Sequence, residues 1–143
     1  DANEAAEVVR WAKFAPLGER GFDGGNRDNA YGMIDAAQYV QDANEQTFIA
    51  IQIESPPALE RVSEIAAVEG IDLVFFGPGD YSVLSGLAGQ SEHPTVLRAT
   101  ERACRAALAA NKRFGSTCAN SVAKPPALPV RIDKALPSRA FSC

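Results

Sequence analysis

The sequence is poor in the residues that build disulfide frameworks and zinc sites. It contains three cysteines and one histidine in 143 residues. The cysteines, at positions 104, 118 and 143, form neither a CxxC pair nor a cysteine–histidine spacing typical of zinc sites. An odd number of cysteines without such spacing is typical of reduced thiols. We therefore expect a cytoplasmic protein rather than a secreted, disulfide-bonded one.

Long apolar runs and clusters of basic residues are also missing. A membrane-spanning helix needs about 20 consecutive apolar residues, and the longest apolar stretches here, residues 47–53 and 71–76, are much shorter. Lysine and arginine number 14 against 18 acidic residues, a formal net charge of −4. Because nucleic-acid affinity depends largely on basic side chains, we expect no membrane and no nucleic-acid partner.

What remains is the composition of one soluble globular domain. Hydrophobic residues make up 46% of the chain and charged residues 22%, and the 11 glycines and nine prolines are spread without a repeat. Residues 1–4 include no initiator methionine, basic segment or apolar segment. We therefore expect no secretory signal here and a start inside a longer gene product.

Hydrophobic spacing predicts alternating helices and strands. Apolar residues at helical spacing predict helices, the first of them capped by Asn3, over residues 4–13, 33–44, 56–68 and 94–110. Runs of β-favouring residues predict strands at 20–22, 47–53, 71–76 and, weakly, 113–118. The two central runs are nearly continuous in apolar residues, which favours strands that are buried on both faces of a parallel sheet.

This order, αβαβαβαβ, predicts an α/β fold with parallel strands joined by helical crossovers. A complete eight-stranded barrel takes about 250 residues, so the chain is either a small open sheet or part of a barrel. The periodicity ends near residue 121. We therefore assign residues 1–121 to the folded domain and residues 122–143 to a poorly packed tail.

Two carboxylates follow the two central strands. Glu54 comes directly after the first, and Asp80 follows the second by one Gly-Pro-Gly segment. Neighbouring parallel strands lie roughly 5 Å apart, so both carboxylates could reach one hard divalent cation such as Mg²⁺ or Mn²⁺. Gln52 points to the same face as Glu54 in a regular strand and could bind a ligand there.

Structural interpretations of the same residues stay open at this point. A Gly-Pro-Gly-Asp segment is often only a turn, and an acidic residue after a strand is often a helix cap or a solvated charge. His93, which precedes a proline at a predicted helix start, is typical of a loop or cap residue. Cys104 lies among alanines in a predicted helix and is expected to be a packing residue.

Four ordered segments resemble the HpcH/HpaI aldolase family. They read KFAPLGERG at 13–21, QIE at 52–54, EIAAVEGID at 64–72 and FGPGDYS at 76–82, and HP at 93–94 opens the next helix. The similarity covers about residues 1–120. Ordered segments in combination are far more specific than either carboxylate alone.

The resemblance implies a parallel (β/α)8 barrel of the TIM type, of which this chain holds about half. It implies that Glu54 and Asp80 bind a divalent metal ion, Mg²⁺ or Mn²⁺, and that Gln52, Asp80 and the Gly79 backbone contact a small 2-oxo acid. It also implies an aldolase reaction that cleaves a 2-oxo-3-deoxy acid to pyruvate and an aldehyde.

The family's first half, with a histidine acid/base and an arginine that clamps the pyruvyl oxygens, has no counterpart here. We therefore assign no catalytic residue within this chain. A half barrel leaves open sheet edges and an exposed inner face, which predicts a partner chain or a homo-oligomer. The alternatives are a citrate-lyase-like or acyl-CoA lyase and a noncatalytic fragment that keeps Glu54 and Asp80 as relics.

Overall fold

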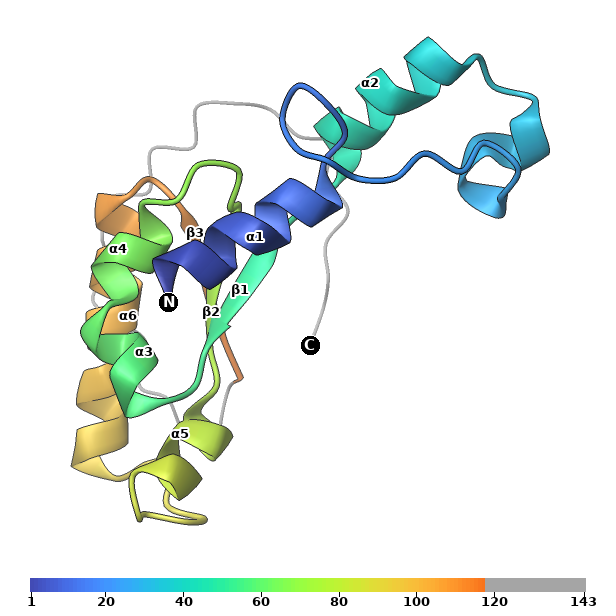
Figure 1. Ribbon diagram of the computed structural model, residues 1–143. Coiled ribbons are helices and arrows are strands. Elements are labelled where there is room, and N and C mark those ends of the chain that lie inside the picture. The colour runs from blue at the N-terminus through green and yellow to red at the C-terminus, as the bar shows by residue number, and fades with distance from the viewer. Residues whose placement is uncertain (118–143) are drawn as a thin grey trace.

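The computed structural model describes residues 1–117, so the predicted tail at 122–143 lies outside the described residues. Within this range the chain alternates helices and strands, as the hydrophobic spacing predicts (Figure 1). The elements are α1 (Ala2–Ala12), the 3₁₀ segment η1 (Arg27–Gly32), α2 (Ala36–Gln46), β1 (Ala50–Ile53), α3 (Pro56–Glu60), α4 (Val62–Ala66), β2 (Leu73–Phe76), α5 (Pro78–Leu84), α6 (Pro94–Ala109) and β3 (Arg113–Ser116). None of the helices in residues 1–117 is long and apolar enough to span a bilayer.

The three strands form one parallel sheet in the order β1-β2-β3. Ile53 is opposite Phe76, and Phe76 is opposite Ser116, so all three strands end at the same edge. The predicted α/β class with parallel strands is therefore confirmed. The described residues form an open three-stranded sheet and not a closed barrel.

The two faces of the sheet differ in burial because side chains alternate along each strand. On the helix-covered face, Ile53, Val74 and Phe76 are at most 1% exposed. The other face, the open face, carries Gln52, Phe75 and Gly115, which are opposite one another across the three strands. Burial on both faces was therefore a wrong prediction for β1, because only one face is covered in the part of the chain described.

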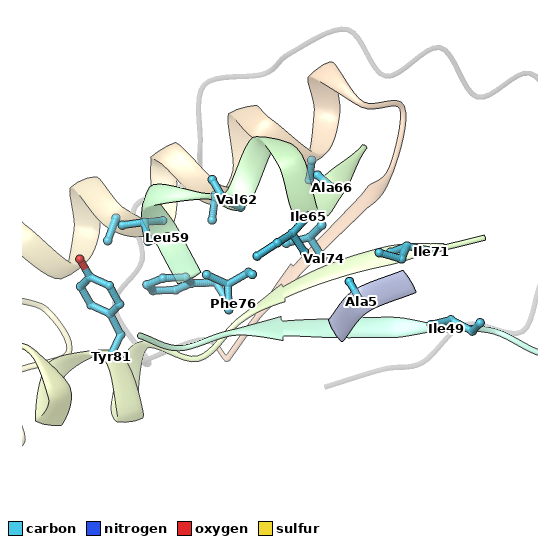
Figure 2. Packing of buried hydrophobic residues seen from close by; sticks show 14 of the residues in the cluster. Ala5, Ile49, Leu59, Val62, Ile65, Ala66, Ile71, Val74, Phe76 and Tyr81 are labelled. Atoms are coloured by element: carbon cyan, nitrogen blue, oxygen red, sulfur yellow. The ribbon is translucent and has the colours of Figure 1, made fainter. Parts of the chain in front are cut away.

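The core lies between the sheet and the helices α1, α3, α4 and α6 (Figure 2). It is a single cluster of aliphatic and aromatic side chains that includes Ala5, Leu59, Val62, Ile65, Val74, Phe76 and Val96. Complete burial of one large apolar side chain contributes about 1.5–3 kcal/mol. This cluster fixes the sheet and thereby the positions of the strand ends.

Helix boundaries follow local capping chemistry. Ser55 caps α3, and its hydroxyl accepts from the Ala58 N–H at 3.4 Å. His93 caps α6, where its Nδ1 accepts from the Thr95 N–H at 3.2 Å, which confirms its expected role as a cap. Proline at the first position of both helices has a preorganised backbone.

Three predictions of local structure were wrong. Asp1 and not Asn3 caps α1, because the Asp1 carboxylate accepts from two N–H groups of the first turn. The expected helix at 56–68 is broken at Arg61 into α3 and α4. Residues 20–22 form no strand, since the Arg20 N–H donates to the Lys13 carbonyl at 2.8 Å instead of to a neighbouring strand.

Residues 13–47, here called the arm, extend away from the sheet and include α2 (Figure 1). The Lys13 ammonium donates to the carbonyls of Asn44 and Thr47, both at 2.6 Å. The rings of Phe14, Phe22 and Tyr39 pack with centroids 5.8–6.3 Å apart. These contacts join the end of α1 to the end of α2 and so fix the base of the arm.

Candidate metal and substrate site

Glu54 lies at the carboxyl edge of the sheet, directly after β1. The Gly77 N–H donates to the Ile53 carbonyl at 2.9 Å, which extends the ladder one residue past β2. Glu54 and Gly77 therefore face each other across the strand ends. Glu54 is only partly buried, so its carboxylate keeps access to solvent.

Gln52 contacts Glu54 on the open face of the sheet. Its Nε2 donates to Glu54 Oε2 at 2.5 Å. The two residues are two apart in β1 and its extension, so their side chains point to the same face. The hydrogen bond holds one carboxylate oxygen of Glu54 and leaves the other available to a ligand.

Gly77 lies against this pair. A Cβ atom built on Gly77 would lie 2.9 Å from Gln52 Nε2 and 3.2 Å from Glu54 Cβ. These distances are shorter than ordinary van der Waals contact, so the pair occupies the space that a side chain at position 77 would fill. From the sequence, Gly77 is either a turn residue or a glycine whose N–H could approach a small anion. The strand register is needed to show its contact with Gln52 and Glu54.

Asp80 lies in the first turn of α5, close in sequence to the end of β2. The sequence predicts a simple turn at 77–80, whereas Gly77 is the N-cap and Pro78 the first residue of a seven-residue helix. Buried Tyr81 and Ser82 anchor this helix, and the Ser82 hydroxyl donates to the Gly79 carbonyl at 2.7 Å. Asp80 is exposed and forms no ion pair within residues 1–117.

Gly79 presents its backbone to solvent. Apart from its chain neighbours and the backbone of its own helix, no atom lies within 4 Å of a Cβ built at this position. In the first helical turn its N–H has no partner within the helix, so it can donate to a ligand oxygen. An exposed backbone at Gly79 is one requirement of the predicted contact with a carboxylate.

The donor set suits a hard divalent cation only in part. Glu54 and Asp80 offer the carboxylate oxygens that Mg²⁺ and Mn²⁺ prefer. Residues 1–117 contain no cluster of three or more histidine, cysteine, aspartate or glutamate side chains that could hold a metal ion. A cation held by these two carboxylates alone would need water and substrate oxygens to complete its coordination, as Mg²⁺ usually does.

Phe75 is a neighbour of the site that the sequence does not single out. It is opposite Gln52 on the open face, and its ring lies over Gly115, where a built Cβ would be 3.0 Å from Phe75 Cδ2. Side chains alternate between the two faces of a strand, so the burial expected for Val74 and Phe76 could have placed Phe75 on the open face. Phe75 supplies an apolar wall beside the polar Gln52–Glu54 pair.

A parallel sheet with acidic side chains at its carboxyl edge defines the class of α/β proteins that bind ligands at the ends of their strands. Residues 1–128 match the family model described as HpcH/HpaI aldolase/citrate lyase. The chain belongs to this family, as the four sequence segments predict.

Curated relatives carry aldolase names. The chain is 41% identical over 115 residues to a hydroxypyruvate/pyruvate aldolase of Delftia acidovorans, a match over 80% of this chain and 42% of the relative. It is 38% identical over 115 residues to a 2-keto-3-deoxy-L-rhamnonate aldolase of Klebsiella pneumoniae, with the same two coverages of 80% and 42%. The chain thus spans less than half the length of these relatives.

Solved structures agree with this assignment. An HpcH/HpaI aldolase from Desulfitobacterium hafniense superposes with a TM-score of 0.77 at 40% identity, over 85% of this chain and 47% of that one. A Burkholderia cenocepacia member of the HpcH/HpaI aldolase/citrate lyase family gives 0.75 at 35% identity, over 80% and 46%. The fold described above is therefore about half of a family member.

Proposed function

We propose that this chain supplies the metal-binding part of a divalent-metal-dependent aldolase that cleaves a 2-oxo-3-deoxy acid to pyruvate and an aldehyde. The observation that carries the proposal is the arrangement at the sheet edge. Gln52 holds the Glu54 carboxylate beside Gly77, and Asp80 follows in the next turn. The aldolase names of the relatives favour this reaction over citrate-lyase-like or acyl-CoA lyase chemistry.

In this proposal Glu54 and Asp80 hold Mg²⁺ or Mn²⁺. When bound, the cation acts as a Lewis acid for the 2-oxo acid and stabilises negative charge on its oxygen. The Gln52 amide and the Gly79 N–H donate to the oxygens of the 2-oxo acid and orient it. The exposed position of Gly79 supports this contact.

The bond that breaks joins C3 and C4 of the 2-oxo acid. Its electron pair goes to C3 of the pyruvyl part, while the C4 hydroxyl gives up its proton and becomes the aldehyde carbonyl. A proton then adds to C3 to complete pyruvate. None of Gln52, Glu54, Gly79 and Asp80 is assigned as the proton acceptor. The family resemblance implies that this base lies in the first half of the barrel.

On its own, this chain would be a cytoplasmic homo-oligomer. Gln52 and Ala50 are exposed on a sheet face that no described element covers, and sheet faces and edges of this kind favour association. Size-exclusion chromatography with light scattering on the 143-residue chain tests this: a concentration-independent monomer would contradict it.

Pyruvate release, coupled to lactate dehydrogenase, tests the reaction. The assay compares the 143-residue chain with the longer gene product, using a 4-hydroxy-2-oxo acid and added Mn²⁺. We expect metal-dependent release by the longer product, loss with EDTA, and little or none by the chain alone. A longer product that is inactive with 2-oxo acids but cleaves acyl-CoA thioesters would support the lyase alternative, and inactivity with both would support the noncatalytic fragment.

A further inference from the structure

Gly77 is buried at the point where the two strand ends meet. Its φ of −97° and ψ of 88° lie outside the left-handed region that favours glycine. The backbone conformation therefore does not explain a glycine at this position. The reason must be sought in the space around its Cα atom.

That space is occupied by the Gln52–Glu54 pair. The nearest atoms to a built Cβ are Gln52 Nε2 at 2.9 Å, Glu54 Cβ at 3.2 Å and Glu54 Oε2 at 3.5 Å. The first and last of these atoms are the donor and acceptor of the hydrogen bond at 2.5 Å. A methyl group at position 77 would thus clash with the donor and press on the Glu54 Cβ atom, while its contact with the acceptor would be an ordinary one.

The atoms in contact differ in how easily they move. The Gln52 amide is the end of a flexible, exposed side chain, whereas the backbone of Gly77 is fixed by its hydrogen bond to Ile53. An added methyl group would therefore displace the Gln52 amide before it disturbs the sheet. Glu54 would lose its hydrogen-bond donor and shift by a few tenths of an ångström, while the fold stays intact.

We propose that Gly77 is a positioning residue, whose missing side chain keeps the Gln52 amide on the Glu54 carboxylate and so orients that carboxylate. This role concerns the hydrogen-bonded pair itself. Its consequence for metal affinity rests on the proposed function. Partners that orient a metal ligand typically affect affinity by about 10- to 100-fold.

The first test reads the hydrogen bond without any metal. In ¹H–¹⁵N spectra of the 143-residue chain, we expect the Gln52 side-chain amide to be shifted from the position of solvated glutamines. Gly77→Ala should return it to that position while the circular dichroism spectrum stays unchanged. Gly21→Ala is the matched control, because a Cβ at Gly21 meets no atom within 4 Å. An unmoved Gln52 signal, or a Gly77→Ala chain that fails to fold, would overturn the proposal.

The second test uses Mn²⁺ titration of the same variants and of Gln52→Ala. We expect Gly77→Ala and Gln52→Ala each to weaken binding by about 10- to 100-fold, and the double variant to be no weaker than Gln52→Ala by more than about threefold. Fully additive losses would show that Gly77 acts elsewhere and would overturn the proposal. Absence of Mn²⁺ binding by the unaltered chain would contradict the proposed function alone, since the Gln52 signal still decides the role of Gly77.

Discussion

The side-chain amide of Asn44 pairs with both backbone groups of Phe14. Asn44 Oδ1 accepts from the Phe14 N–H at 2.7 Å, and Asn44 Nδ2 donates to the Phe14 carbonyl at 3.1 Å. At the point where the chain leaves α1, Asn44 is thus the partner of the Phe14 N–H and shares the Phe14 carbonyl with the N–H groups of Leu17 and Gly18. Together with the Lys13 ammonium, it fixes the base of the arm.

Asn44→Ala should loosen this base. The variant removes both hydrogen bonds and leaves the Phe14 N–H of this buried residue without its partner, which costs about 1–3 kcal/mol. The Phe14 carbonyl still accepts from the N–H groups of Leu17 and Gly18. Urea denaturation measures the free energy of unfolding, and hydrogen exchange at the Phe14 N–H should accelerate. Asn3→Ala, at an exposed position of α1, is the control and should change stability by less than about 0.5 kcal/mol. Equal stability of the two variants would contradict the assigned role of Asn44.

Phe76→Ala should lower the free energy of unfolding more than Asn44→Ala does. Phe76 is completely buried against the helices, and removal of a buried aromatic ring costs about 3–5 kcal/mol. The same denaturation experiment measures the loss. Val83→Ala, which removes a side chain that is 57% exposed, should have little effect. A loss below about 1 kcal/mol for Phe76→Ala would show that the site collapses around the missing ring.

Glu54→Gln and Asp80→Asn should each weaken Mn²⁺ binding by more than about 100-fold, because each removes a charged ligand of the proposed site and not only a group that orients one. Calorimetric titration measures the affinity. Glu69→Gln, an exposed carboxylate away from the sheet edge, should leave it unchanged. If Asp80→Asn binds as tightly as the unaltered chain, the site depends on Glu54 alone and the two-carboxylate hypothesis is wrong.

Cys104 should react slowly with alkylating agents. Burial raises the pKa of its thiol, and the opposing effect of the Arg105 charge is smaller. Since the thiolate is the nucleophile, a raised pKa leaves less of it at pH 8, and the rate should climb as the pH rises further. Iodoacetamide labelling with peptide mass mapping compares Cys104 in the folded and urea-unfolded chain. Equal rates would contradict the effect of burial.

The helices and strands could be predicted from the sequence where spacing and caps agree. Pro94 after His93 predicts the start of α6, and the structure begins that helix at the same residue. The segment at 77–80 shows where such signals fail. Its residue types favour a turn, yet proline is equally suited to the first position of a helix. Burial of Tyr81 in the core favours the helix, α5.

The site could be predicted only as far as the edge on which its residues lie. Glu54 and Asp80 follow parallel strands, and that places them at one edge of the sheet without fixing their side chains. The contact of Gly77 with Gln52 depends on the register of β1 against β2. Register comes from packing of Ile53 and Phe76 against the helices, which local sequence patterns do not specify.

The alternation along β1 limits which changes of length this strand tolerates. Loss or gain of one residue between Ala50 and Ile53 would move side chains of β1 to the opposite face of the sheet. The Gln52 amide would then face the helices, and Ile53 would lie on the open face. A change of two residues would keep this parity and only slide the strand. Evolutionary drift in strand length should therefore proceed here in steps of two.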